Sequence, residues 1–539
     1  MTRLAGLDGE TFDALIIGGG MAGAGVARDL ALRGVSVALF EKGDFASSTT
    51  GRSSKLIHGG LRYLELWDFG LVRESLRERE TLQRLAPHLI RPLPFLVPIY
   101  RGSSRGLIKV RIGLTLYAWL TPEKRSERYR VLRAPEALAL EPGIRAGDLL
   151  GAGYYFDDLL MFPERLCLEN LLSAVRHGAR AFNYCQVEEM VRGRVGIEGL
   201  RVRDLFSDTV HTVRGRVIVN AAGPWVDRIR ELARIRDRGA RLIRTTKGIH
   251  CLLPRMTDRA VYVSTRDDRM IFMIPWRQFS LVGTTDTDFA GNPDRLWAEK
   301  DEVSYLLREV RRVFPDPRVA ETNVVYTYAG VRPLTFAAGK SASKVSRQHK
   351  VFSEARGKFL TITGTKLTCF RSLAEEVGNR VLANLRRRAP SLTARRTLDG
   401  TDEAPSLEVR AWMDVSPELM ATSLPRETLE MLVETYGRRY SGVLDLARKL
   451  PDGSDRLCPR NPEIVAQLHH AVAEELTVSL QDFLLRRTGI GLSPCQGLDC
   501  AEAIGRRMGE LLGWSPRRLE AELAAYHETI ERSHRFRHS

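Results

Sequence analysis

The sequence predicts an α/β protein that combines a parallel sheet, an antiparallel sheet and a separate helical domain. Residues 14–40 alternate a β run, a glycine turn, a helical stretch and a second β run, which is the pattern of a βαβ unit. Two short apolar runs much later, at 216–220 and 359–362, are each followed by glycine. Because strands of such units pair in parallel, we expect these distant runs to join the first two in one nucleotide-binding sheet.

The sequence between those strands indicates a second sheet. Residues 270–275 and 279–283 form a hairpin pattern, so we expect an antiparallel sheet that covers the substrate. A helix is expected from Gly364 through Leu385, with Lys366 one turn into it, and the arginine-rich stretch from there to about Asp402 is typical of a linker.

The last part of the chain indicates a helical domain. Strand signals nearly vanish after the linker, and helical periodicity is clearest at 462–476 and 500–512. The chain has 539 residues, of which 43% are hydrophobic and 27% are charged. That composition is enough for a large core and excludes a disordered or fibrous protein.

The charge of the chain restricts its partners. The 82 basic residues exceed the 66 acidic ones, so the formal net charge is +16. Basic surfaces attract nucleic acids, anionic lipids or anionic small molecules. The seven cysteines include no metal-like CxxC pair, so we expect a reduced cytosolic environment and no metal.

Two apolar segments bear on membranes. The segment at 92–100 is short and rich in proline, and the segment at 107–120 is interrupted by Lys109 and Arg111. Neither reaches the ~18 apolar residues that a spanning helix needs, although either can lie on a bilayer. We see no signal peptide at the N-terminus.

A glycine motif predicts a dinucleotide site. Gly18, Gly20 and Gly23 form GxGxxG between a strand and a helix, and Glu41 ends the next strand. The glycines allow a tight turn, the helix N-terminus faces a pyrophosphate, and the acid accepts hydrogen bonds from ribose hydroxyls. An acid there favours FAD or NAD over a 2′-phosphorylated cofactor, and this fingerprint alone leaves both open.

A longer motif identifies a family. The run SSKLIHGGLRYLE at 53–65 resembles the FAD-dependent glycerol-3-phosphate dehydrogenase family at this distance from the glycine fingerprint. Further motifs follow in the same order as in the family. The helical part of the chain, including DFLLRRT at 482–488, resembles the family less closely. The ordered motifs are NAAGPW at 220–225, KGIH at 247–250, GTTDTD at 283–288, GVRPL at 330–334 and GTKLT at 364–368.

The resemblance implies a fold, a cofactor and a reaction. The fold is an FAD-binding Rossmann-like domain with an antiparallel-sheet substrate domain of the glycine oxidase and D-amino-acid oxidase type, plus a helical C-terminal domain. The reaction is oxidation of sn-glycerol 3-phosphate to dihydroxyacetone phosphate by FAD, with electrons passed to a membrane quinone. One departure concerns Thr365, which replaces a second glycine before the lysine and places a side chain beside the expected flavin.

The resemblance also divides the chain. The FAD-binding domain has three parts, which are interrupted by a covering, membrane-facing segment and by a substrate domain. We expect 1–90 as its first part, 91–165 as the covering segment, 166–225 as its second part, 226–345 as the substrate domain, 346–390 as its last part and 400–539 as the helical domain.

Binding of a phosphate group and stabilisation of reduced flavin both need basic side chains. Arg332 in GVRPL resembles the family arginine over the flavin, where its guanidinium suits the phosphate or the developing alkoxide. Arg62 with its neighbour Tyr63, and Arg347, are further substrate candidates. Lys366 is expected to stabilise reduced flavin. The remaining cofactor candidates are Ser54, Lys55, Leu56, Ala222, Gly364, Leu367 and Thr368.

The substrate proton needs a base. His250 and His58 are both candidates, because the unperturbed pKa of histidine is near neutrality. His58 is an alternative cofactor contact, and direct action of Arg332 on the alkoxide stays open. Asp286 and Asp288 follow a strand without a histidine or cysteine cluster, so a turn-stabilising role is favoured over a metal site.

Two other functions compete with the quinone-linked dehydrogenase. One is an oxygen-dependent glycerol-3-phosphate oxidase. The other is a basic flavoprotein that binds nucleic acid, which the absence of a zinc finger, an RNP motif or a recognition helix disfavours. The cations Arg101, Arg105, Lys109, Arg111 and Lys124 near the segment at 107–120 favour an anionic membrane surface. We therefore expect a cytoplasmic enzyme attached peripherally to the inner face of the cell membrane, as a possible homodimer that binds no nucleic acid.

Overall fold

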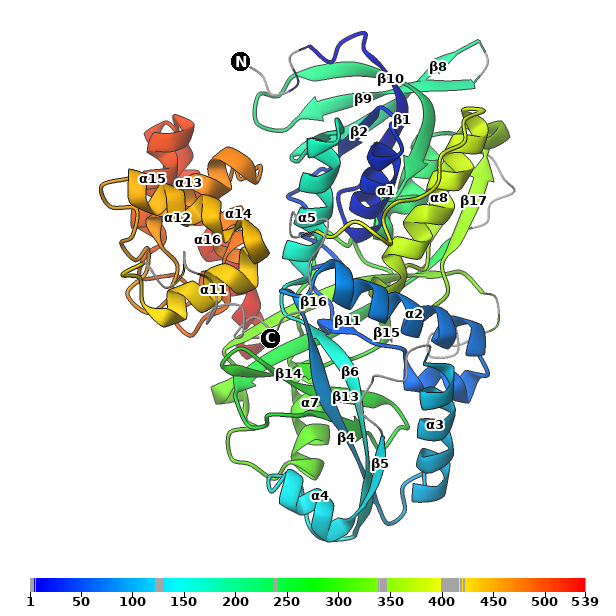
Figure 1. Ribbon diagram of the computed structural model, residues 1–539, viewed down its shortest axis with the longest axis vertical. Helices are drawn as coiled ribbons and strands as arrows, with labels where there is room; N and C mark the ends of the chain where they lie inside the picture. Colours follow the sequence, from blue (N-terminus) through cyan, green and yellow to red (C-terminus); the bar gives the residue numbers. More distant parts are fainter. Residues whose placement is uncertain are drawn as a thin grey trace.

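The computed structural model describes most of the chain in two sheets and a helical domain (Figure 1). The described residues are 4, 6–121, 129–194, 196–235, 241–337, 339, 347–398, 416, 419 and 422–538. Lys124 and part of the expected linker lie outside them.

The first sheet contains the predicted parallel strands. Its order is β17-β18-β10-β1-β2-β7, with β9 on β10 and β8 on β9. Strand β1 pairs in parallel with β2 and with β10, and β10 pairs in parallel with β18, so the expected sheet is confirmed. The bounds are β1 Thr11–Ile17, β2 Val37–Phe40, β7 Arg180–Phe182, β8 Cys185–Gly193, β9 Gly196–Asp204, β10 Val210–Asn220, β17 Lys350–Glu354 and β18 Phe359–Thr363.

Both faces of this sheet are covered. Every residue of β2 and β18 is buried, as expected where helices and a second layer enclose parallel strands. Helix α1 packs against α5 and α8, and their apolar side chains form one core with β1 and β2. The helices are α1 Met21–Leu32, α5 Pro163–Arg176, α6 Val226–Leu232 and α8 Phe370–Asn384.

The second sheet is mainly antiparallel. Its order is β15-β11-β14-β13-β12-β4-β6-β3, with β16 on β11 and β5 on β6. The predicted hairpin is β13 and β14, joined with Trp276 opposite Phe279. The bounds are β3 Leu56–Ile57, β4 Ile90–Tyr100, β5 Arg130–Arg133, β6 Leu149–Leu160, β11 Ile243–Pro254, β12 Ala260–Ser264, β13 Met270–Trp276, β14 Phe279–Gly283, β15 Thr287–Asp288 and β16 Tyr326–Thr335.

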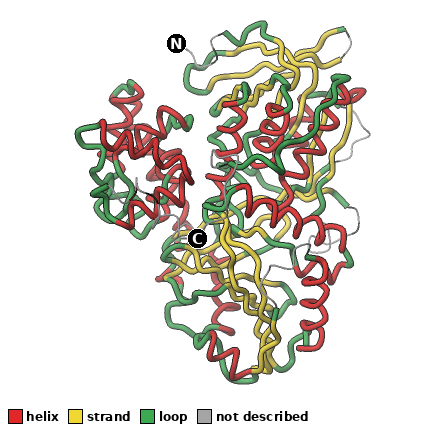
Figure 2. Tube along the Cα trace, viewed as in Figure 1, coloured by secondary structure: helices red, strands yellow, loops and turns green. Residues whose placement is uncertain are grey.

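Several helices border the second sheet, and Figure 2 shows helices in red beside its yellow strands. They are α2 Phe69–Leu85, α3 Leu107–Leu120, α4 Ala134–Leu140 and α7 Lys300–Val313. The apolar segment at 92–100 belongs to β4, which pairs with β6 along its length. Its place in the sheet corrects the expectation that this segment is free to lie on a bilayer.

The end of the chain forms the expected helical domain, seen in orange and red beside the two sheets in Figure 1. The predicted helices at 462–476 and 500–512 correspond to α13 and α15. The bounds are α11 Arg426–Tyr436, α12 Tyr440–Lys449, α13 Val465–Glu474, α14 Leu480–Asp482, α15 Ala501–Leu512 and α16 Pro516–His534.

A buried charge cluster fixes this domain to the first sheet. Asp44, in the loop after β2, accepts hydrogen bonds from Arg487 at 2.8 and 3.0 Å and from Arg486. Arg486 also donates to Asp482 at 2.8 Å, and Tyr184 donates to the same carboxylate. Two carboxylates thus face two guanidinium groups, and we call these four charged residues the balanced cluster.

One helix starts later than predicted. Residues 367–369 form a 3₁₀ turn, α8 begins at Phe370, and Lys366 has extended backbone with φ −87° and ψ 134°. The prediction that Lys366 lies one turn into a helix is therefore wrong. Gly364 has φ +71°, and a Cβ there would lie 2.8 Å from the Gln348 carbonyl oxygen, so the chain turns there before the helix can start.

Candidate active site

A large cavity opens at the carboxyl ends of β1, β2, β10 and β18 and extends to the second sheet. Its volume is about 1120 Å³, above the ~300–1,000 Å³ of common small-molecule pockets. The first sheet contributes its strand ends and glycine turn, and the second contributes side chains from β11 and β16. A ligand in this cavity would contact both sheets at once.

The glycine motif shapes one end of the cavity. Gly18 has φ +108°, and a Cβ there would lie 2.6 Å from the carbonyl oxygen of Ala221. A Cβ on Gly23 would lie 1.9 Å from the carbonyl oxygen of Gly18, so this glycine lets α1 pack against the turn. Gly18 and Gly20 line the cavity and Gly23 supports them from behind.

Glu41 lies where a ribose-binding acid is expected. Its carboxylate accepts N–H groups of Gly19 at 2.7 Å and Gly43 at 2.8 Å, and it lines the cavity. Burial raises the pKa of Glu41, and these two backbone N–H groups oppose that rise. Each carboxylate oxygen has one of these bonds and retains a lone pair that can accept a ligand hydroxyl.

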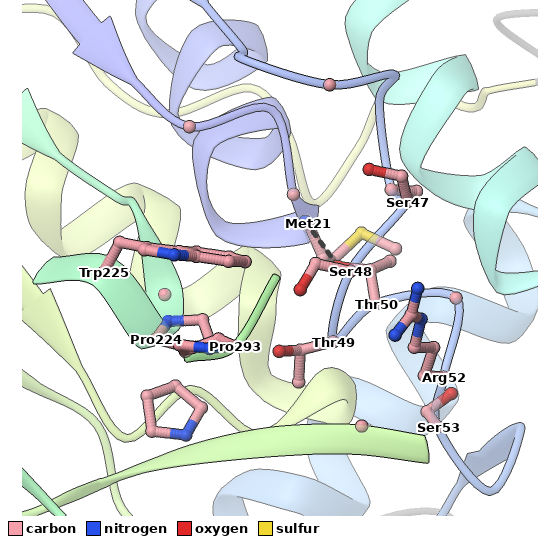
Figure 3. A pocket seen from close by; sticks show the side chains of 18 of the residues that line it. Met21, Ser47, Ser48, Thr49, Thr50, Arg52, Ser53, Pro224, Trp225 and Pro293 are labelled. Atoms are coloured by element: carbon pink, nitrogen blue, oxygen red, sulfur yellow. Dashed lines mark hydrogen bonds between the residues drawn. The ribbon is translucent and has the colours of Figure 1, made fainter. Parts of the chain in front are cut away.

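The loop after Glu41 adds hydroxyl groups that the sequence analysis did not single out. Figure 3 shows Ser48, Thr49 and Thr50 facing the cavity opposite Trp225. Thr50 accepts the N–H of Met21 at 3.0 Å, which fixes the loop against the start of α1. The run of four hydroxyl residues at 47–50, six positions after the acid, is the signal that could have indicated this loop.

His250 lies on β11 at the cavity wall. Its Nε2 is 2.8 Å from the hydroxyl of Ser54, and its ring stacks on Tyr328 with centroids 4.9 Å apart. Gly283 stands opposite it in the sheet, and a Cβ there would lie 2.3 Å from the imidazole. The glycine of GTTDTD therefore makes room for the histidine of KGIH.

The imidazole of His250 is neutral at neutral pH. Burial holds its pKa well below the ordinary value, and the positive charges of Arg332 and Lys55 add to that effect. Its Nδ1 is buried and makes no hydrogen bond within the described part of the chain. An unsatisfied buried polar atom costs about 1–3 kcal/mol. Nδ1 is shielded from solvent, whereas Nε2 lies beside Ser54, which lines the cavity.

Arg332 lies on β16, next to the same glycine-lined space. Its guanidinium donates to the hydroxyl of Thr284 at 2.6 Å and to the carbonyl of Thr285 at 3.1 Å, and lies 3.4 Å from Asp286. A Cβ on Gly248 would lie 2.2 Å from this group. Burial lowers the pKa of Arg332 to about 10, against the attraction of Asp286.

Further basic residues gather around Tyr63. Burial raises the pKa of this phenol, and the charges of Arg347, Arg62 and Arg332 act in the opposite direction. Arg347 pairs with Asp286 at 3.1 Å, and the Lys366 ammonium lies 5.1 Å from the Tyr63 ring centroid. We call the four basic residues Arg62, Arg332, Arg347 and Lys366 the cationic cluster.

The four basic residues of the cationic cluster have more positive charge than the carboxylate in contact with them neutralises. Among the described residues, Asp286 is the carboxylate that contacts this cluster. Asp286 forms ion pairs with Arg332 and Arg347. Arg62 has no ion-pair partner within the described ranges. The excess charge suits a phosphate dianion. Asp286 thus holds Arg332 and Arg347 in place, whereas Asp288 pairs with Arg244.

Lys366 uses all of its donors on the protein. Its ammonium donates to the carbonyls of His58 at 2.7 Å and Gly59 at 3.3 Å, and to the hydroxyl of Ser75 at 2.8 Å. Burial lowers its pKa to about 8. Lys366 therefore fixes the His58 loop and adds positive charge beside the cavity.

His58 is held mainly through its backbone. Its N–H donates to Thr368 at 3.2 Å, and its carbonyl accepts from Lys366. Burial and the charge of Lys366 keep the pKa of its imidazole well below the usual value. His58 lines the cavity but has fewer polar contacts through its ring than His250 has.

The sequence-predicted residues divide into two sets. The proposed catalytic residues all line the cavity, as do all the cofactor candidates except Gly23. Arg62, Tyr63 and Arg347 are not among the residues that line this cavity; the two arginines belong to the cationic cluster, which surrounds Tyr63. Ser54 contacts His250, Lys55 is buried 3.8 Å from Glu164, and Thr365 lines the cavity with its side chain half-buried.

The residues present fit a dinucleotide. The glycine turn allows a ligand to approach the backbone closely, and the carboxylate of Glu41 can still accept hydrogen bonds from a ligand. Helix α1 points its N-terminus at the cavity, where it can face a pyrophosphate. The indole N–H of Trp225, at the cavity wall, has no partner among the described residues. These features together favour FAD at this site.

Two family models match the chain. The model described as FAD dependent oxidoreductase covers residues 13–363, and the model described as C-terminal domain of alpha-glycerophosphate oxidase covers residues 391–519.

The relatives cover the whole chain. The glycerol-3-phosphate dehydrogenase of Synechocystis sp. is 36% identical over 99% of this chain and 99% of its own length. The aerobic glycerol-3-phosphate dehydrogenase of Staphylococcus aureus is 32% identical over 98% of this chain and 95% of its own.

The solved structures agree in fold. The glycerol-3-phosphate dehydrogenase of Bacillus halodurans complexed with FAD has a TM-score of 0.81 and 27% identity over 98% of this chain and 96% of its own. Glycine oxidase from Geobacillus kaustophilus has a TM-score of 0.56 and 19% identity over 73% of this chain and 100% of its own, and shows the likeness of fold alone.

Proposed function

Because the chain belongs to the FAD-dependent oxidoreductase family, we propose that it is an FAD-dependent glycerol-3-phosphate dehydrogenase. The proposed reaction oxidises sn-glycerol 3-phosphate to dihydroxyacetone phosphate. The observation that carries this proposal is the cationic cluster beside a dinucleotide-shaped cavity. It explains why a phosphorylated alcohol rather than an amino acid is the proposed substrate of this fold.

FAD, when bound, supplies a hydride acceptor for the secondary alcohol carbon. The glycine turn, Glu41 and the loop with Ser48, Thr49 and Thr50 would hold the dinucleotide. The arginines of the cationic cluster would bind the substrate phosphate through charge-assisted hydrogen bonds, and Asp286 keeps two of them in position. Phosphate binding thereby orients the alcohol in the cavity.

His250 is the proposed base. With its proton on Nδ1, the imidazole presents the Nε2 lone pair beside the hydroxyl of Ser54, which lines the cavity, and this lone pair would accept the proton of the substrate hydroxyl in place of that of Ser54. The depressed pKa keeps this lone pair available at neutral pH. Stacking on Tyr328 fixes the ring plane. His58 is the other candidate, but the described part of the chain forms hydrogen bonds only with its backbone.

The test is the visible spectrum of the purified protein under anaerobic conditions. Glycerol 3-phosphate is expected to bleach the absorbance of oxidised flavin, and lactate and glycine are expected to leave it unchanged. Bleaching by all three compounds, or by none, would contradict the proposal. Mixing the reduced protein with a quinone analogue or with air then compares the acceptors. We propose quinone, and rapid peroxide formation in air would favour an oxidase instead.

The proposed membrane attachment rests on an exposed apolar face. Ile108 and Trp119 of α3 expose 78% and 81% of their surface, and Ile112 between them exposes 56%. Trp67, at the end of a neighbouring 3₁₀ turn, exposes 79%. These four side chains, which we call the α3 face, resemble a surface that inserts shallowly into a bilayer. No helix within the described residues is long and apolar enough to cross a membrane.

Basic residues border the α3 face. Arg101 and Arg111 are exposed, whereas Arg105 and Lys109 both contact Glu65. The exposed charges suit anionic headgroups, and we propose peripheral attachment to the inner face of the cell membrane. Cosedimentation with anionic vesicles should fall when Ile108 and Trp119 are both changed to Glu. The control, Leu511→Glu at an exposed position of α15, should bind like the unchanged protein. Equal binding by both variants would contradict attachment through α3.

A further inference from the structure

Three cysteines of the helical domain meet although they are far apart in sequence. Cys458 follows α12, and Cys495 and Cys500 flank the turn before α15. The Sγ atom of Cys458 lies 3.7 Å from the Sγ of Cys495 and 3.7 Å from Oδ1 of Asp499. The ligand atoms of Cys458, Asp499 and Cys500 all lie within 4.8 Å of one another.

These spacings match ligands arranged around one ion. Zinc–sulfur bonds are about 2.3 Å long, so two sulfur ligands of a tetrahedral ion are separated by about 3.8 Å. A disulfide instead requires about 2.05 Å between its sulfur atoms. The contact between Cys458 and Cys495, at 3.7 Å, therefore has the length of a tetrahedral edge.

The surroundings supply the donors that metal thiolates use. The buried amide of Asn461 donates to the sulfur of Cys458 at 3.0 Å and to that of Cys495 at 3.3 Å. The hydroxyl of Ser493 lies 3.2 Å from the Cys495 sulfur but donates its hydrogen to the carbonyl of Ile490 at 2.7 Å, so Asn461 is the donor to sulfur. Donors of this kind stabilise negative sulfur and fix the orientation of metal ligands.

The site also has an anionic oxygen and an open side. Arg460 lies 3.6 Å from Oδ2 of Asp499, while Oδ1 of the same carboxylate faces Cys458. Cys458 and Cys500 are buried, Cys495 is half-buried and Asp499 is exposed. The partly exposed ligands leave an entry path, which a metal site needs.

We propose that Cys458, Cys500 and Asp499, whose ligand atoms already lie within 4.8 Å of one another, bind one Zn²⁺ ion in a structural site. Cys495, whose sulfur contacts that of Cys458, completes the site when its side chain turns toward the other two ligands. Three thiolates and a carboxylate give four ligands, the usual number for structural zinc, and soft sulfur ligands favour Zn²⁺ over Mg²⁺ or Ca²⁺. Binding releases the thiol protons to water and changes no oxidation state. The sequence does not reveal the site because its cysteines are spread over two loops.

The ion would join the loop at 458 to the turn at 495–500. That turn contacts the rest of the molecule, because the side chain of Gln496 donates to the carbonyl of Val325 at 2.8 Å, next to β16. The hydroxyl of Tyr526 on α16 donates to the Gln496 carbonyl. The proposed zinc therefore stabilises the junction between the helical domain and the second sheet, outside the catalytic cavity.

Metal analysis of the purified holoenzyme tests the proposal. After dialysis against a weak chelator we expect about one zinc per chain, and below about 0.1 in Cys458→Ser and Cys500→Ser. The control, Cys251→Ala, removes a buried cysteine outside the cluster and should retain its zinc. Retention of zinc by both serine variants would overturn the assignment of these ligands.

A measurement on the unchanged protein covers the case in which the serine variants do not fold. Exchange of the ion for Co²⁺ should give thiolate-to-cobalt charge-transfer absorption and intense tetrahedral bands. No bound metal after incubation with Zn²⁺ and reductant would overturn the proposal, and so would stoichiometric iron in place of zinc. An intact mass about two daltons low, with a Cys458–Cys495 linkage found by peptide mapping, would identify a disulfide instead.

Discussion

The balanced cluster and the cationic cluster both bury arginines beside carboxylates, but they differ in charge balance. In the first, Asp44 and Asp482 face Arg486 and Arg487, and every charge has an opposite partner. In the second, there are four basic residues, and among the described residues Asp286 is the carboxylate that pairs with them, through Arg332 and Arg347 only. A matched set of charges stabilises a junction, whereas an excess of one sign prepares a site for a ligand of the other sign.

The pKa shifts of Asp44 and Arg332 show the same difference in charge balance between the two clusters. Burial opposes ionisation of Asp44, but Arg487 and Arg486 outweigh it and lower the pKa of that carboxyl. At Arg332 burial prevails over Asp286 and lowers the pKa of the guanidinium to about 10. The cationic cluster thus lacks negative charge that a bound phosphate would supply.

The largest effect is expected in the balanced cluster. Asp44→Asn leaves Arg487 without its buried counter-charge and should lower the free energy of unfolding by about 3–5 kcal/mol. Denaturant unfolding of the purified protein measures it. Asp445→Asn breaks an exposed pair with Arg448 and should cost at most about 1 kcal/mol. Equal losses in the two variants would show that the balanced cluster is not a stabilising junction.

Arg332→Met should affect catalysis rather than stability. Loss of a guanidinium aimed at the substrate should lower kcat/KM for glycerol 3-phosphate by about 10²–10³-fold. The free energy of unfolding should change little, because Asp286 keeps Arg347. Steady-state kinetics beside unfolding curves measure both, and Arg308→Met, at an exposed position of α7, is the control. A large loss of stability with normal kcat/KM would place Arg332 with the structural arginines.

A smaller effect is expected at Arg62. This arginine has no ion-pair partner among the described residues, so its contribution should appear only with an anionic substrate. Arg62→Ala should raise KM for glycerol 3-phosphate by about tenfold, corresponding to about 1.4 kcal/mol, with kcat little changed. Initial-rate measurements test this, and a fall in kcat at unchanged KM would contradict a phosphate-binding role.

The smallest effect concerns pH. Burial lowers the pKa of Lys366 to about 8, so its charge is lost as pH rises through that value. We expect kcat/KM to fall on the alkaline side with a midpoint near pH 8, and Lys366→Arg to move that midpoint upward because arginine stays charged. A pH profile unchanged by Lys366→Arg would contradict the assignment.

The lowered pKa of Lys366 also determines whether its contribution to the free energy of unfolding rises or falls with pH. Between about pH 8 and the ordinary lysine pKa of 10.5, the unfolded chain binds more protons at this residue than the folded chain does. The contribution of Lys366 to the free energy of unfolding therefore increases with pH in that window. Comparison with Lys366→Met, which has no titrating group there, isolates it.

Local patterns predict much of this molecule. The glycine fingerprint, the apolar runs and the helical periodicity each depend on neighbouring residues, and β1, α1, β2, β10, β18 and the β13–β14 hairpin lie where they predict. The motif residues His250 and Arg332 could be assigned to one region. The reason for the glycines beside them, Gly283 and Gly248, became evident only from the paired strands.

Contacts between distant residues could not be predicted in the same way. Asp44 meets Arg487 and Cys458 meets Cys495 because whole domains and loops pack together, and no short pattern records that packing. The start of α8 was also missed, since Gly364 at φ +71° turns the chain before Lys366. Backbone geometry at one residue thus moved a functional side chain from a helix to a loop.

The central claim is that the cationic cluster recognises the substrate phosphate. Anaerobic stopped-flow reduction of the flavin by glycerol 3-phosphate and by glycerol, in the unchanged protein and in Arg332→Met, tests it most directly. The account predicts that the unchanged protein prefers the phosphorylated alcohol by at least about 10³-fold and that the variant loses most of that preference. A preference that survives the substitution intact would contradict it.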